Sequence, residues 1–78
     1  MTVRYFAAAR AAAGVAEERV SAPTLATLRK ELVASHGEQL ARVLEIASFL
    51  VDGLAWHEPD APLPATGTVD VLPPFAGG

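Results

Sequence analysis

The alternation of hydrophobic and polar positions predicts strands near both ends of the chain. Residues 3–7 place Val3 and Tyr5 at a period of two, and residues 18–21 fit a second short strand. Residues 69–72 alternate in the same way, and two prolines follow them directly. Because proline cannot donate a hydrogen bond to a strand ladder, the last strand is expected to end there.

The middle of the chain carries the spacing of helices. Thr24 is a suitable N-cap, and Gly37 is a suitable helix stop. Between them an apolar stripe recurs at helical intervals, formed by Leu25, Leu28 and Leu32. Residues 40–47 carry a second, shorter stripe of the same kind. The alanine-rich residues 7–13 fit either a helix or a loop between two strands.

A hairpin is predicted in the second half of the chain. Residues 49–51 and 54–56 flank Asp52-Gly53, a tight-turn pair, and the proline-containing residues 57–64 form a loop. The resulting order is strand, strand, helix, helix, strand, strand, strand. It predicts one α+β domain over residues 1–78, with a mixed sheet of about five strands packed on one main helix and a short second helix.

Composition narrows the function classes. The chain has 78 residues, no cysteine and a net charge of -3. It therefore has no thiol for catalysis, disulfides or metal binding, and its scattered basic residues argue against nucleic acid as a partner. No apolar run approaches the ~20 residues of a membrane helix, so a cytoplasmic location is expected. Two isolated histidines, His36 and His57, predict no metal site.

The C-terminal residues 73–78 form an unusual tail, Pro73-Pro74-Phe75-Ala76-Gly77-Gly78. The prolines stiffen the exit from the last strand, and the final glycines carry no side chain. Five extended residues span about 17 Å, enough to enter a narrow channel in another protein. The ionised carboxylate of Gly78 is a group that an enzyme could adenylate before exchanging oxygen for sulfur. The alternative is a frayed terminus without function.

A second candidate site follows from strand parity. Phe6 shares a strand face with Arg4, and Leu72 shares one with Asp70. If the two charged residues face water, Phe6 and Leu72 form an apolar patch on the open face of the sheet. Such a patch would bind a partner protein, although scattered exposed apolar residues are common in proteins.

The sequence resembles the small, sulfur-carrying subunit of molybdopterin synthase over nearly its whole length. The matching residues are Val3-Arg4-Tyr5-Phe6-Ala7, Ala9-Arg10, Gly14, Thr24-Leu25, Leu28, Leu50-Val51, Asp52-Gly53, Pro62-Leu63, Val69-Asp70-Val71-Leu72-Pro73-Pro74 and Ala76-Gly77-Gly78. The C-terminal motif is the specific part of this resemblance, and the rest fits a β-grasp, ubiquitin-like fold. One stretch, residues 65–68, lacks the acid that the family commonly has there.

The resemblance implies a cycle centred on Gly78. An ATP-dependent adenylating enzyme activates its carboxylate, and a sulfurtransferase converts it to a thiocarboxylate. The tail, with Pro74, Phe75, Ala76 and Gly77, then inserts into the large subunit of molybdopterin synthase, where sulfur passes to cyclic pyranopterin monophosphate. The chain is then a sulfur-donor subunit with no bound cofactor and no catalytic side chain. A heterotetramer of two small and two large subunits is also implied.

Three other functions fit the same residues. The chain could deliver sulfur to thiamine or cysteine synthesis, with the same fold and tail. It could be a ubiquitin-like modifier that is joined through Gly78 to lysines of other proteins. It could also be an interaction domain without tail chemistry. The tail favours the sulfur carriers, and the Pro-Pro-aromatic sequence favours the molybdopterin pathway among them.

Overall fold

The computed structural model describes residues 1–74 of the chain. Phe75, Ala76, Gly77 and Gly78 lie outside the described residues. The elements follow in the order β1 (Thr2–Tyr5), α1 (Ala8–Ala13), β2 (Glu17–Arg19), α2 (Leu25–His36), α3 (Glu38–Ile46), β3 (Ser48–Val51), β4 (Leu54–Ala55) and β5 (Thr68–Leu72).

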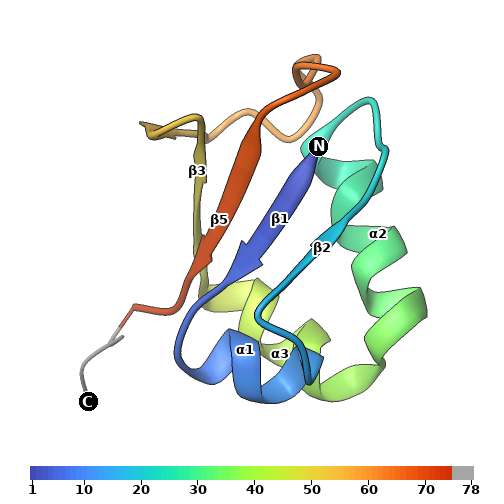
Figure 1. The fold of residues 1–78 in the computed structure, drawn as a ribbon, viewed down its shortest axis with the longest axis vertical. Helices are drawn as coiled ribbons and strands as arrows, with labels where there is room; N and C mark the ends of the chain where they lie inside the picture. The colour runs from blue at the N-terminus through green and yellow to red at the C-terminus, as the bar shows by residue number, and fades with distance from the viewer. Residues whose placement is uncertain (75–78) are drawn as a thin grey trace.

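The strands form one five-stranded mixed sheet in the order β2-β1-β5-β3-β4, which confirms the predicted sheet. The first and last strands, β1 and β5, lie side by side and parallel near its centre (Figure 1). All other pairings are antiparallel. Since β5 has a neighbour on each side, the chain enters its C-terminal tail directly from a strand held by two ladders.

The hydrophobic core lies on one face of the sheet, where the helices pack. Val3, Tyr5, Val69 and Val71 alternate into this core from the two central strands. The predicted stripe of α2 is buried against them, and α3 adds two more leucines. The helix core residues are Leu25, Leu28, Leu32, Leu40 and Leu44. Trp56 is partly buried against the same cluster.

The structure contains three helices in its described part rather than the two that were predicted. The additional helix is α1, in the alanine-rich segment that also fitted a loop. Ala9 is fully buried, and the backbone N–H of Gly14 closes the last turn on the carbonyl of Arg10. Gly14 has a positive φ of 78°, which ends the helix there. Packing of small alanines, rather than propensity alone, decides between helix and loop.

The ends of α2 are built as its sequence predicted. The hydroxyl oxygen of Thr24 accepts a hydrogen bond from the backbone N–H of Thr27 at 3.2 Å, as an N-cap does. At the other end Gly37 has a φ of 89°, and its N–H donates to the carbonyl of Val33 at 2.8 Å. Gly37 also precedes the first residue of α3, so one glycine turns the chain between the two helices.

The hairpin between β3 and β4 is also anchored to β5. Asp52 and Gly53 both have positive φ, which a tight two-residue hairpin turn requires. The carboxylate of Asp52 accepts a hydrogen bond from the backbone N–H of Thr68 at 2.8 Å. A Cβ on Gly67 would lie 2.6 Å from this carboxylate, so the side chain of Asp52 occupies the space that glycine leaves.

Candidate functional site at the tail exit

The tail leaves the protein from the end of the central strand β5. Leu72 pairs with Ser48 at the start of β3, and β1 ends at Tyr5, opposite Val71. Pro73 follows the strand, and Pro74 is exposed at the last described position. The predicted tail residues Phe75, Ala76, Gly77 and Gly78 lie outside the described residues. The structure thus describes the base of the tail.

Phe6 and Leu72 lie near this exit on the side of the sheet that the helices leave open. Phe6 is 37% exposed, and its backbone N–H donates to the carbonyl of Val71 at 3.2 Å. Leu72 is partly exposed, one residue after Val71. We call Phe6 and Leu72 the exit patch. The binding role predicted for the exit patch stays a prediction, since these contacts describe its geometry alone.

The expectation that both charges beside the exit patch face water is wrong for Asp70. This carboxylate is buried, with 9% of the residue exposed. The side chain of Arg4 covers it with two hydrogen bonds, from Nε to Oδ1 at 2.7 Å and from Nη2 to Oδ2 at 3.1 Å. These bonds and the charge of Asp70 raise the pKa of the Arg4 guanidinium. Parity placed both residues on the open face, but it could not show that they pair.

A polar cluster on the helix side of the sheet was not predicted. The hydroxyl of Tyr5 donates to Oε2 of Glu18 at 2.6 Å, and Nε2 of His36 bonds the same oxygen. Since an ionised carboxylate only accepts, His36 carries the proton on Nε2 in this contact. Burial, reinforced by Glu18, raises the pKa of the Tyr5 hydroxyl. The cluster links β1, β2 and the end of α2.

The ionisation of Glu18 is expected to make the free energy of unfolding depend on pH in the acidic range. Burial alone would raise the pKa of Glu18, but the hydrogen bonds from Tyr5 and His36 lower it below its ordinary 4.5. A lowered folded-state pKa means that stabilisation is present above pH 4.5 and is lost as pH falls through the folded value. Glu18→Gln should therefore lower the free energy of unfolding near neutral pH by about 1–2 kcal/mol and flatten its acid dependence.

The measurement is urea unfolding of the wild type and of Glu18→Gln at neutral and acidic pH. Glu17→Gln is the matched control, because Glu17 is an exposed neighbour on the same strand. The control should change stability by less than about 0.5 kcal/mol at either pH. An acid dependence that is unchanged in Glu18→Gln would contradict the assignment.

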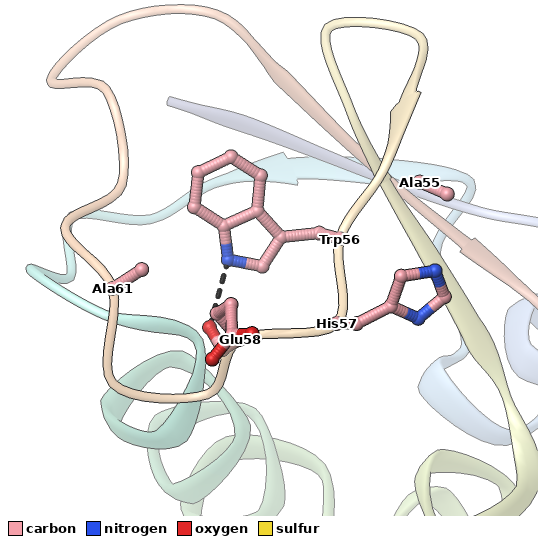
Figure 2. Close-up of a pocket in the computed structure, with 5 residues that line it drawn as sticks. All are labelled: Ala55, Trp56, His57, Glu58 and Ala61. Atoms are coloured by element: carbon pink, nitrogen blue, oxygen red, sulfur yellow. Dashed lines mark hydrogen bonds between the residues drawn. The ribbon is translucent and has the colours of Figure 1, made fainter.

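Two hollows lie beside β4, and the second reaches Ser48, the strand partner of Leu72. One, of about 230 Å³, lies around the indole of Trp56, whose Nε1 donates to the carbonyl of Glu58 at 3.0 Å (Figure 2). The other, of about 330 Å³, extends along β3 to Ser48 and includes His57. Figure 2 shows the ring of His57 pointing away from the carboxylate of Glu58, so the two do not form an acid–base pair.

Residues 1–74 contain no metal-binding cluster and no membrane-spanning helix. Residues 1–74 contain no group of three His, Asp or Glu side chains that could hold a metal ion. Within the same residues no helix is long and apolar enough to cross a membrane. The tail and the surface around its exit therefore remain the strongest candidate site in this chain.

Comparison with solved structures shows several close folds. A protein assigned as molybdopterin converting factor subunit 1 from Pyrococcus furiosus is 27% identical, with a TM-score of 0.80 over 94% of each chain. SAMP1 from Haloferax volcanii is 25% identical, with a TM-score of 0.81 over 100% of this chain and 98% of that one. Both establish the predicted β-grasp fold, which ubiquitin-like modifiers and sulfur carriers share.

A third structure shares the fold at lower identity. It is a complex of subunits 1 and 2 of the molybdopterin-converting factor from Helicobacter pylori, 23% identical, with a TM-score of 0.74 over 99% of this chain and 96% of that one. Comparison with curated proteins gives no match. The model of the ThiS family matches residues 3–78, which include all of the sheet except Thr2 and also the Gly-Gly tail. The chain therefore belongs to the ThiS family of small sulfur-carrier β-grasp proteins.

Proposed function

We propose that this protein carries sulfur for molybdopterin synthesis on the carboxylate of Gly78. The observation that carries the proposal is the continuity between the central strand β5, the Pro73-Pro74 exit and a tail that ends in two glycines. The family match through Gly78 and the likeness to a subunit 1 of molybdopterin converting factor support it.

The chemistry needs no side chain of this protein. The Gly78 carboxylate attacks the α-phosphorus of ATP in an adenylating enzyme, and pyrophosphate leaves. A sulfur nucleophile then attacks the acyl carbon and expels AMP, which leaves a thiocarboxylate. In the large subunit of molybdopterin synthase this sulfur passes to cyclic pyranopterin monophosphate. The role of this chain is to present the terminus on a rigid base, and glycine lets a partner approach it closely.

The test uses the purified chain with a candidate adenylating enzyme, ATP and sulfide. Intact-mass measurement should show one oxygen replaced by sulfur, and the reaction without ATP should show none. The thiocarboxylated chain is then given to a molybdopterin synthase large subunit with cyclic pyranopterin monophosphate, and in parallel to a thiazole synthase with its substrates. Product in the first reaction alone supports the proposal, and product in the second alone supports a thiamine pathway.

A second candidate is a protein modifier, which the likeness to SAMP1 favours. In that case the Gly78 acyl group would be joined to lysines by an amide bond. After digestion with chymotrypsin, which cleaves after Phe75, mass spectrometry of cell extracts should then find lysines that carry Ala76-Gly77-Gly78. Thiocarboxylate on the purified chain, without such conjugates, would favour the carrier.

The exit patch is proposed to bind the partner that receives the tail. Leu72→Asp should weaken the affinity for the adenylating enzyme at least about tenfold, because it puts a charge into an apolar contact. Leu54→Asp is the matched control, since Leu54 is 69% exposed at the start of β4. Binding is measured by calorimetry after melting curves confirm that each variant is folded. Equal affinities of the two variants would remove the exit patch from the proposal.

A further inference from the structure

The open face of the sheet beside the exit patch carries an ion pair between the buried carboxylate of Asp70 and the half-exposed side chain of Arg4. Asp70 lies on the central strand β5, in register with Arg4 on one side and Leu50 on the other. The two carboxylate oxygens of Asp70 both accept hydrogen bonds from Arg4, at 2.7 and 3.1 Å. An arginine–carboxylate pair with two parallel bonds has a fixed orientation, so Arg4 is held in one position on this face.

Arg4 is also part of the exit surface itself. Its guanidinium carbon lies 5.7 Å from the centroid of the Phe6 ring, and 48% of its side chain is exposed. A guanidinium has five N–H groups. Within residues 1–74, the hydrogen bonds of Arg4 come from Nε and Nη2 and both end on Asp70. These bonds use two of the five N–H groups, so three have no acceptor within residues 1–74 on a side chain that is 48% exposed.

A partner that covers the exit patch removes water from these N–H groups. Leaving a buried donor without an acceptor costs free energy, so the partner must supply an oxygen. The charges of the neighbouring side chains indicate whether that oxygen is charged or neutral. Asp70 already neutralises Arg4, and Glu17 lies across from Arg4 on β2 and adds a further negative charge. Another carboxylate would therefore meet net negative charge in a site that loses water.

Resting on the proposed function, we propose that Arg4 is a specificity-determining residue for the enzyme that activates Gly78. That enzyme presents an apolar surface to Phe6 and Leu72, and an uncharged oxygen, from a backbone carbonyl or an amide side chain, to Arg4. An enzyme that offers only apolar atoms at this point binds poorly, because Arg4 then loses its hydrogen bonds to water without replacement.

The test compares steady-state activation of the wild type and the double variant Arg4→Leu/Asp70→Leu. Replacing both members leaves no buried charge without its partner, so the variant is expected to fold. Its KM in the adenylation reaction should rise at least about tenfold, with kcat changed less than about twofold, because Arg4 contacts the partner away from the reacting carboxylate. Arg19→Leu is the matched control, an exposed arginine of β2 on the same face, and should change neither.

A conservative variant and a salt series are two further tests of the role of Arg4. Arg4→Lys keeps the charge beside Asp70 but loses the planar fork, so it should raise KM even if the double variant fails to fold. The salt dependence of KM should agree within about threefold between the wild type and the folded double variant, because the pair that the variant removes is neutral as a unit. A much steeper salt dependence in the wild type would overturn the uncharged acceptor, and an unchanged KM in Arg4→Lys and the folded double variant would overturn the role of Arg4. If no enzyme activates the wild type, the proposed function itself fails.

Discussion

Deletion of Gly78 is expected to abolish the sulfur-dependent mass gain completely while leaving the fold intact. The reacting carbon belongs to this residue, and deletion moves the carboxylate by one position, about 3.5 Å along an extended chain. A near-attack geometry fixed by a partner does not tolerate a displacement of that size. The core is unaffected, since the last strand ends six residues earlier, at Leu72.

The measurement is intact mass after incubation with the adenylating enzyme, ATP and sulfide. A urea unfolding curve of the same variant checks that its fold is intact. A chain with one alanine appended after Gly78 is the matched control, because it keeps every residue and moves only the carboxylate. It should also fail to gain sulfur. A mass gain that persists in the deleted chain would show that Gly78 is not required and would contradict the assignment of the sulfur to this residue.

Leu28→Ala is expected to have the largest effect on stability, a loss of about 3 kcal/mol. Leu28 is fully buried in the hydrophobic cluster that the sheet and the helices form. Its truncation loses the transfer free energy of the side chain and leaves a cavity that a small domain cannot fill. A domain of this size has a total stability of only about 4–12 kcal/mol. The variant should therefore unfold at much lower urea and at a lower temperature.

Leu54→Ala is the control for that substitution, because it removes the same atoms from a side chain that is 69% exposed. It should shift the free energy of unfolding by less than about 0.5 kcal/mol. Equal losses in the two variants, from urea curves fitted with a common slope, would mean that the helix–sheet core does not hold the fold as described.

Much of this fold could be predicted because its signals are local. A threonine cap and a glycine stop bracket α2, and Asp52-Gly53 identifies the hairpin. Each of these features depends on residues within a few positions of one another. The alanine-rich segment is the exception among the elements, because its helix depends on the burial of Ala9 against the rest of the core.

The features that could not be predicted all depend on distant pairing. The sequence order of strands does not show that β1 lies beside β5. Arg4 and Asp70 are 66 residues apart, and their ion pair exists only because that parallel register places them side by side. Glu18 and His36 meet in the same way, across an edge strand and a helix end. Proposals about the open face therefore need the structure, whereas the importance of the tail did not.

The parallel placement of the two terminal strands has a mechanical consequence. The N-terminus leads into β1 at one end of the sheet, and the tail leaves β5 at the other. A force that pulls these ends apart acts along the strands, so it loads the hydrogen bonds between β1 and β5 in shear, all at once. Unzipping a hairpin instead breaks such bonds one after another. A partner that grips and pulls the tail should therefore meet high resistance to unfolding, and the carrier can be withdrawn from a tight channel without losing its fold.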